Sequence, residues 1–232
     1  MRLNPPPSAV SRKYTAAIFD FEGTLVDFQW QLALAEAELR RGFAGLGFGG
    51  DEFARGNYAA MWNAAAGLLA PQGRIAELQQ AMAPIYDRWD MDALTRWTPR
   101  PGAAELLCRL ATRGSRVGMV SNVGRAALTL ALNRFDFARW LSPVVTRDEV
   151  SCMKPAPEGI LRVLSDWQAA ADRVLFVGDS RADVSGARAA GMHVAIIRGG
   201  ECDEADFADA PPDYMISHLN EIGELIAGRW VQ

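Results

Sequence analysis

Six short apolar runs recur along this chain, and helical patterns separate them. The runs cover residues 15–19, 116–120, 143–146, 174–177, 193–197 and 214–216. Because apolar residues follow one another without polar alternation, the runs are typical of strands that are covered on both faces. A helix between successive strands produces right-handed parallel crossovers. The pattern therefore predicts an α/β fold, a Rossmann-like three-layer sandwich around a mainly parallel sheet.

Residues 28–98 interrupt this alternation with helical periodicity throughout. We expect three apolar stripes in this segment to pack on one another as a small bundle inserted after the first strand. The stripes are Leu32, Ala35, Leu39 and Phe43; Ala54, Tyr58, Met61, Trp62, Ala65, Leu68 and Leu69; and Ile75, Leu78, Met82, Ile85, Tyr86 and Trp89. We therefore predict a core domain of residues 14–27 and 99–232 and a helical cap domain of residues 28–98. Prolines at 5–7 favour an extended, disordered tail over residues 1–13.

Charge and cysteine content narrow the classes of partner. The formal net charge is −4, and because no run of Lys or Arg exceeds two residues, we expect neither nucleic acid nor an anionic membrane as a partner. Three widely spaced cysteines fit neither a disulfide framework nor a zinc site, which favours the reducing cytoplasm. No apolar stretch is long enough to span a membrane. A small molecule is the expected partner, and both a monomer and a homodimer stay open.

Two carboxylates follow the first apolar run, in the sequence Asp20-Phe21-Glu22-Gly23-Thr24. Open α/β sheets bind their ligands at the carboxyl ends of parallel strands, which is where these side chains would lie. Gly23 allows a sharp turn of the backbone, and Thr24 offers a hydroxyl to the loop or to a ligand. Acidic residues are also ordinary turn residues after strands, so this motif alone has two interpretations.

Three further polar motifs follow later strands or lie between them. Ser121 and Asn122 follow the second run, where Ser121 would also serve as a helix cap. Lys154 precedes Pro155, and taken alone it could be an ordinary surface lysine. After the fourth run, Asp179 is followed by Asp183 at helical spacing, so both carboxylates would face the same side. The acidic stretch 201–213 is expected to be a solvated loop.

Together these motifs resemble the four motifs of the haloacid dehalogenase superfamily of phosphotransferases. That family carries a D-x-D-G-T strand end, a Ser or Thr strand end, a Lys often followed by Pro, and a G-D-x-x-x-D acidic turn. All four occur here in order, between Asp20 and Asp183. By its position, length and helicity, the insert is similar to the C1-type cap of the subfamily that includes phosphoglycolate phosphatases and 2-haloacid dehalogenases.

The resemblance implies a role for each motif residue in a phosphatase reaction. Asp20 would be the nucleophile that forms an aspartyl-phosphate, and Lys154 would balance the charge on the nucleophile and the phosphate. The ligands of a Mg²⁺ ion would be the Asp20 carboxylate, the Glu22 backbone carbonyl and the Asp179 carboxylate.

The remaining motif residues would bind the substrate or support the catalytic groups. Ser121 would donate a hydrogen bond to a phosphoryl oxygen, with Asn122 and Thr24 as further substrate-binding residues. Asp183 would orient Lys154 or a water molecule of the metal.

Glu22 departs from the family pattern, in which most phosphatases carry Asp at this position as general acid and then base. Glu has the same chemistry, and the enolase-phosphatase branch also carries it, although its extra methylene moves the carboxyl group. The dehalogenases lack an acid here, because a halide needs no proton. We therefore expect a Mg²⁺-dependent hydrolase of a small phosphate monoester, similar to phosphoglycolate phosphatase.

Three other interpretations account for part of the pattern. A 2-haloacid dehalogenase-like hydrolase is the enzymatic alternative, and a phosphate-dependent binding protein with weakened catalysis is the non-enzymatic one. A receiver-type signalling domain also uses an acidic strand end, a Ser or Thr and a Lys. Such a domain has no long helical insert and no late acidic turn, so the sequence speaks against it.

Overall fold

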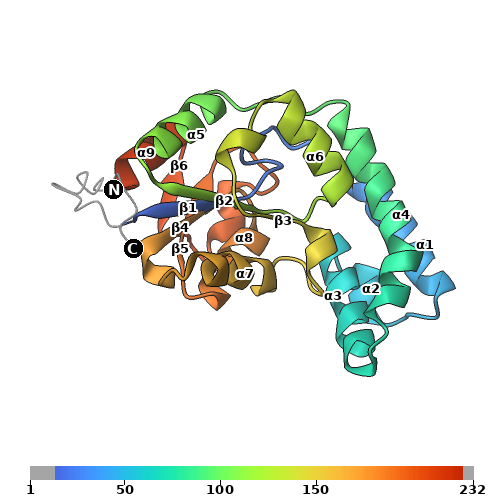
Figure 1. The fold of residues 1–232 in the computed structure, drawn as a ribbon. Helices are drawn as coiled ribbons and strands as arrows, with labels where there is room; N and C mark the ends of the chain where they lie inside the picture. The colour runs from blue at the N-terminus through green and yellow to red at the C-terminus, as the bar shows by residue number, and fades with distance from the viewer. Residues whose placement is uncertain (1–13, 227–232) are drawn as a thin grey trace.

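A computed structural model describes residues 14–226 and shows one six-stranded parallel sheet (Figure 1). The strands are β1 (Ala16–Phe19), β2 (Arg116–Val120), β3 (Val144–Val145), β4 (Val174–Gly178), β5 (His193–Ile197) and β6 (Tyr214–Ile216). They lie in the order β3-β2-β1-β4-β5-β6, and all five neighbouring pairs are parallel. The predicted α/β fold is confirmed. The tail predicted over residues 1–13 lies outside the described residues.

Helices cover both faces of this sheet (Figure 1). The helices α5 (Ala103–Thr112), α6 (Arg125–Arg134) and α9 (Ile222–Leu225) pack on one face, and α7 (Glu158–Trp167) and α8 (Arg181–Ala189) pack on the other. In β1, Ala17 and Phe19 belong to the first of these two cores, whereas Ala16 and Ile18 belong to the second. Alternate residues of one strand are therefore buried on opposite faces, which explains the unbroken apolar runs.

Short 3-10 helices connect several of these elements. They are η1 (Ala70–Gln72), η2 (Ala138–Trp140), η3 (Arg147–Glu149), η4 (Ala171–Arg173), η5 (Glu204–Phe207) and η6 (Leu219–Glu221). The segment η3 follows β3 directly, and it therefore lies near the carboxyl ends of the strands.

The four helices of the insert lie to one side of the sheet (Figure 1). They are α1 (Leu32–Gly45), α2 (Asp51–Arg55), α3 (Tyr58–Leu69) and α4 (Ile75–Leu94). The second predicted stripe is divided between α2 and α3, because α2 ends at Arg55 and Asn57 caps α3, with its side chain accepting a hydrogen bond from the backbone N–H of Ala60. Ala54 and Leu68 of that stripe are exposed, and Phe53 is buried instead.

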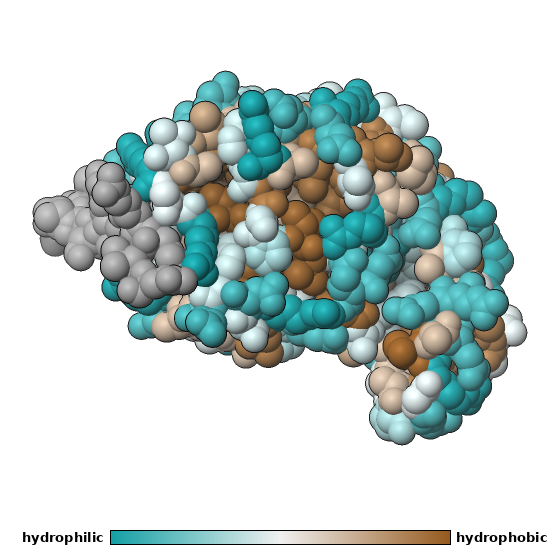
Figure 2. All heavy atoms as spheres, in the orientation of Figure 1, coloured by the Kyte–Doolittle hydropathy of each residue, from teal (hydrophilic) through white to brown (hydrophobic). Residues whose placement is uncertain are grey.

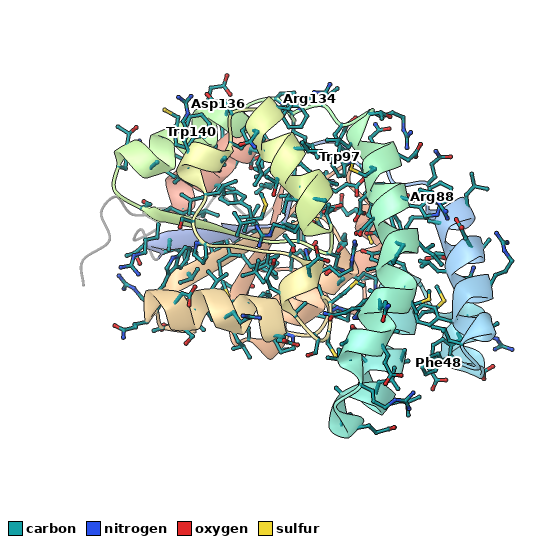
Figure 3. The ribbon with its side chains drawn as sticks, turned by 45° about the vertical axis from the view of Figure 1, so that its right-hand side comes forward. Phe48, Arg88, Trp97, Arg134, Asp136 and Trp140 are labelled. Atoms are coloured by element: carbon teal, nitrogen blue, oxygen red, sulfur yellow. The ribbon has the colours of Figure 1, made fainter. Side chains whose placement is uncertain are left out.

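Two chain segments connect the insert to the core, and they run side by side. Val26 forms isolated bridges with both Glu22 and Pro99. The backbone N–H of Asp27 donates to the Thr98 carbonyl at 3.0 Å. Trp97, which Figure 3 shows close to the core end of α4, is fully buried with its ring edge-on to Phe21. The two connections are therefore hydrogen-bonded to each other next to the end of β1.

The surface of the insert is mostly hydrophilic in the view of Figure 2. Leu46 and Leu68 are exposed hydrophobic residues of this part of the chain. Within residues 14–226, the structure contains no helix with the length and hydropathy that a membrane span requires.

Candidate active site

Three neighbouring strands bring the predicted residues to one edge of the sheet. In the registers of β1 with β2 and β4, Phe19 pairs with Met119 and with Val177. The residues that follow these strands therefore meet, and Asp20 lies close to the loops that carry Ser121 and Asp179. Lys154, from the connection between β3 and α7, reaches the same place. The strand ends lie where parallel sheets usually form binding sites.

Lys154 is buried between two carboxylates. Its Nζ lies 2.7 Å from Asp20 Oδ1 and 2.6 Å from Asp183 Oδ1, and the residue is 4% exposed. Burial disfavours the charged form of Lys154, but the attraction of Asp183 and Asp20 outweighs it and raises the pKa of the lysine. Lys154 is therefore a fixed positive charge beside the proposed nucleophile.

Asp183 holds Lys154 from the first turn of α8. Its Oδ2 accepts hydrogen bonds from the backbone N–H groups of Asp179 and Ser180 and from the Ser180 hydroxyl, at 3.1, 3.0 and 2.8 Å. Its other oxygen accepts from Lys154. Asp183 thus accepts four hydrogen bonds, one of them from the charged Lys154, and this number of donors favours a role in orienting Lys154 over direct binding of a metal ion.

Asp179 lies in a cradle formed by glycines. A Cβ at Gly23, where φ is +77°, would lie 2.0 Å from Asp179 Oδ2, and a Cβ at Gly200 would lie 2.3 Å from the same oxygen. Thr24 donates its hydroxyl to Asp179 Oδ1 at 2.9 Å, and the backbone N–H of Glu201 donates to Oδ2 at 2.7 Å. Thr24, expected to bind substrate, is fully buried, and its hydroxyl is bonded to this carboxylate rather than lining the pocket.

The acidic side chains of this edge fit a divalent cation. Carboxylate oxygens of Asp20, Asp179 and Asp183 lie within 4.8 Å of one another. Burial raises the pKa of Asp20 to about 6 against the opposing effect of Lys154, and burial together with Asp183 and Asp20 raises that of Asp179. The negative charge that these three carboxylates can carry thus exceeds the single positive charge of Lys154. Since Asp183 already accepts four hydrogen bonds, whereas Asp179 accepts one on each oxygen, Asp20 and Asp179 are the carboxylates that best suit a hard cation such as Mg²⁺.

The carboxyl group of Glu22 is bonded to both connections of the insert. Its Oε1 accepts hydrogen bonds from the backbone N–H groups of Gln29 and Trp30 at 2.8 and 2.7 Å, and from Trp97 Nε1 at 2.9 Å. Burial raises the pKa of Glu22 to about 8, although these donors favour its charged form. Its Oε2 accepts no hydrogen bond from residues 14–226. Glu22 therefore links the carboxyl end of β1 to both segments that connect the insert to the core.

Ser121 and Asn122 line the pocket above Asp20. The Ser121 side chain is 3% exposed, and its hydroxyl accepts a hydrogen bond from the backbone N–H of Val123. The Asn122 side chain bonds both backbone groups of Lys154, with Oδ1 accepting at 3.0 Å and Nδ2 donating at 3.1 Å. Asn122 therefore holds the Lys154 backbone as well as lining the pocket.

The pocket lies between the core and the insert. The insert contributes Trp30, Tyr58 and Asp90 to its wall, opposite Asp20 and Lys154 of the core. Its empty volume is about 480 Å³, part of which is open to solvent. The insert therefore lies against the strand ends and forms one wall of this pocket.

Two acids of the pocket, one half-buried and one buried, were missing from the residues expected at the site. Glu201, expected in a solvated loop, lines the pocket, and burial raises its pKa to about 7. Nothing in its local pattern indicated this, because its place depends on the packing of its loop against Asp179. Asp90 is 2% exposed. It lies four residues after Tyr86 on an apolar stripe, and a carboxylate at such a position indicates a buried ion pair or hydrogen bond.

Comparisons with known proteins agree with this geometry. The profile of a family described as haloacid dehalogenase-like hydrolase matches residues 14–191. A phosphoglycolate phosphatase from Nitrosococcus oceani is 32% identical over 127 residues, which cover 55% of this chain and 56% of that protein. The chain thus spans about half the length of several curated relatives of this name.

Two other comparisons extend over most of the chain. An N-acetylmuramic acid 6-phosphate phosphatase from Pseudomonas aeruginosa is 28% identical over 216 residues, 91% of this chain and 94% of that protein. A crystal structure from Bacteroides fragilis, described as a haloacid dehalogenase-like hydrolase, superposes with a TM-score of 0.66 at 23% identity. The superposition covers 90% of this chain and 100% of the Bacteroides fragilis chain, and it supports the assignment of the fold.

Proposed function

The chain belongs to the haloacid dehalogenase-like hydrolases, and from this premise we propose that it hydrolyses a small phosphate monoester through a phosphorylated Asp20. The observation that carries the proposal is the buried contact of Lys154 with Asp20, at 2.7 Å, beside the carboxylate of Asp179. A carboxylate fixed between a lysine and a cation site suits attack on a phosphoryl group, whose charge needs cations around it.

Two steps convert the ester and restore the enzyme. In the first step, a carboxylate oxygen of Asp20 forms a bond to phosphorus while the ester P–O bond breaks, and Glu22 gives a proton to the leaving alcohol. In the second step, Glu22 accepts a proton from a water molecule that attacks the phosphorus. The bond to Asp20 then breaks, and inorganic phosphate leaves.

The residues at the strand ends would hold a Mg²⁺ ion through the carboxylates of Asp20 and Asp179 and the carbonyl of Glu22. Such an ion supplies positive charge to the phosphoryl oxygens and to the crowded carboxylates. Asp183 fixes Lys154, and Asn122 fixes the lysine backbone. Ser121, which lines the pocket, would donate its hydroxyl proton to a phosphoryl oxygen.

Residues 28–98 act as a cap domain in this proposal. The position of the pocket supports this role, because its walls come from the insert as well as from the core. The insert would open for binding and close for the reaction, which then proceeds with little water present.

Two substrate candidates come from the relatives. Phosphoglycolate is the first, because several matching proteins carry the name phosphoglycolate phosphatase. N-acetylmuramic acid 6-phosphate is the second, because the relative of that name aligns over 91% of this chain. Both are small phosphate monoesters, the class that the site supports.

A phosphate-release assay with both candidates, p-nitrophenyl phosphate and a set of sugar phosphates tests the proposal, in Mg²⁺ and in EDTA. We expect Mg²⁺-dependent turnover that Asp20→Asn lowers at least a thousandfold, as on the order of 10⁶ is lost when nucleophiles of other hydrolases are removed. Asp172→Asn, an exposed carboxylate before β4, is the matched control and should keep full activity.

Two outcomes would reject the proposal in favour of the alternatives. Halide release from 2-chloropropionate without phosphate release would indicate a dehalogenase. Binding of inorganic phosphate without turnover of any ester in any divalent metal would indicate a binding protein.

A further inference from the structure

A buried arginine of the core is paired with carboxylates of the insert. Arg147, in η3, is 1% exposed. Its Nη1 donates to Asp90 Oδ2 at 2.9 Å and its Nη2 to Asp87 Oδ1 at 2.5 Å, and both acceptors lie on α4. Asp148, the neighbouring acid of the core, lies 3.8 Å from Arg147 Nε. Both carboxylates that form short ion pairs with this guanidinium therefore belong to the insert, and these pairs exist only while the insert lies against the core.

Asp90 receives its hydrogen bonds from outside its own helix. Oδ1 accepts from Trp30 Nε1 at 3.0 Å, and Oδ2 accepts from the backbone N–H of Gly124 at 2.9 Å and from Arg147. Trp30 belongs to a connection of the insert, whereas Gly124 and Arg147 belong to the core. One buried carboxylate thus joins α4 to the loop 121–124.

The same arginine also holds that loop directly. Arg147 Nη1 donates to the carbonyl of Asn122 at 3.0 Å, and the Arg147 backbone N–H donates to the carbonyl of Val123 at 3.4 Å. A Cβ at Gly124 would lie 2.4 Å from Arg147 Nη2 and 2.7 Å from Asp87 Oδ1. The loop that carries Ser121 is therefore shaped to fit closely around this ion pair.

We propose that Arg147 and Asp90 are positioning residues that make the arrangement of the Ser121 loop depend on closure of the insert. When the insert closes, Asp90 neutralises Arg147 and accepts the Gly124 N–H. Arg147 then fixes the carbonyls of Asn122 and Val123, and Ser121 comes to its place beside Asp20. This inference rests on the proposed function for its kinetic consequence, but its structural consequence is measurable without turnover.

Two variants of different chemistry test the pair. Asp90→Asn keeps the shape of the side chain, but its amide hydrogens must face Trp30 Nε1 or the donors Gly124 and Arg147. Gly124→Ala changes no charge and is compatible with the local φ of −70°, but its methyl group displaces the guanidinium. For both we expect kcat to fall about ten- to a hundredfold with KM changed less than threefold, because small displacements of positioning groups have effects of this size.

The double variant shows whether the two changes act through one contact. We expect Asp90→Asn combined with Gly124→Ala to lower kcat no further than the more severe single change. Multiplied effects would overturn the proposal, because independent sites combine additively in free energy. Glu38→Gln is the matched control, since it removes the ion pair between Glu38 of α1 and Arg88 of α4, and Figure 3 shows Arg88 between these two helices. Its kcat should stay within twofold of wild type.

Hydrogen exchange of the intact chain supplies the readout that needs no activity. In Asp90→Asn, we expect faster exchange in the peptide that spans residues 121–127 and unchanged exchange in α1. Unchanged exchange at 121–127, or faster exchange spread evenly over the insert, would overturn the proposal. If wild-type protein turns over no ester, the proposed function fails, but the exchange result still tests whether Arg147 and Asp90 position the Ser121 loop.

Discussion

Asp183 belongs to the acidic cluster of the site, but its hydrogen bonds favour a role in positioning Lys154 over direct binding of the metal ion. Both of its oxygens are occupied, one by Lys154 and the other by the backbone and hydroxyl donors at the start of α8. We predict that Asp183→Asn lowers kcat about ten- to a hundredfold, because Lys154 loses the partner that positions it. The Mg²⁺ concentration for half-maximal activity should change less than threefold, as a metal titration will show. A larger change in Mg²⁺ dependence than in kcat would mean that Asp183 binds the metal itself.

Glu22 gives a second residue-scale prediction, because the need for an acid depends on the leaving group. We predict that Glu22→Gln lowers kcat/KM at least about a hundredfold for an alkyl phosphate, whose alcohol must be protonated. The loss in kcat/KM should be under tenfold for p-nitrophenyl phosphate, whose phenolate leaves without a proton. The ratio kcat/KM is the quantity to compare, because it reports formation of the phosphorylated Asp20 and excludes the later attack of water, in which Glu22 acts on both esters. Equal losses on both would assign Glu22 to structure alone, through its bonds to Trp30 and Trp97.

At the scale of elements, the sheet and its polar strand ends could be predicted from the sequence, because each strand buries both faces and leaves a continuous apolar run. The residues after β1, β2 and β4 therefore came together as expected. Asp90 and Glu201 were not foreseen, since their partners Arg147 and Asp179 come from distant segments. The hydrogen bonds of Glu22 to the connections of the insert also depend on packing that no local pattern encodes.

The turn after β1 carries an element-scale prediction with a built-in control. Gly23 and Gly47 have similar positive φ values, +77° and +84°. A Cβ added at Gly23 would lie 2.0 Å from Asp179 Oδ2, whereas a Cβ added at Gly47 would meet only open space. We predict that Gly23→Ala weakens Mg²⁺ binding at least tenfold and removes most activity. Gly47→Ala should cost only the backbone strain, about 1 kcal/mol in the free energy of unfolding. Calorimetric Mg²⁺ titration and thermal unfolding of both variants check this, and equal Mg²⁺ affinities would contradict it.

At the scale of the whole molecule, the acidic pocket links stability to pH and metal. Burial raises the pKa of Asp20, Glu201 and Glu22 to about 6, 7 and 8. Between their ordinary values near 4 and these raised values, the folded protein holds protons that the unfolded chain has released. The free energy of unfolding therefore falls as pH rises from about 4 to about 8.

Mg²⁺ should reverse this trend, because a divalent cation favours the charged carboxylates. We predict that the increase in Tm on adding Mg²⁺ to EDTA-treated protein is small at pH 5.5 and grows towards pH 8. Thermal unfolding across this range, with Asp179→Asn as the variant that should lose the increase, measures the effect. A Mg²⁺ increase that is independent of pH would contradict the assignment of the cation to this cluster.

The most direct measurement of the central claim is the capture of a phosphorylated Asp20 during turnover. Enzyme mixed with an active phosphate ester is quenched within one turnover and reduced with borohydride, which converts an aspartyl-phosphate to homoserine, and its peptides are sequenced by mass spectrometry. The proposed reaction predicts homoserine at position 20, dependent on the ester and absent from Asp20→Asn. Efficient turnover that leaves Asp20 unmodified, or modification at another residue, would contradict it.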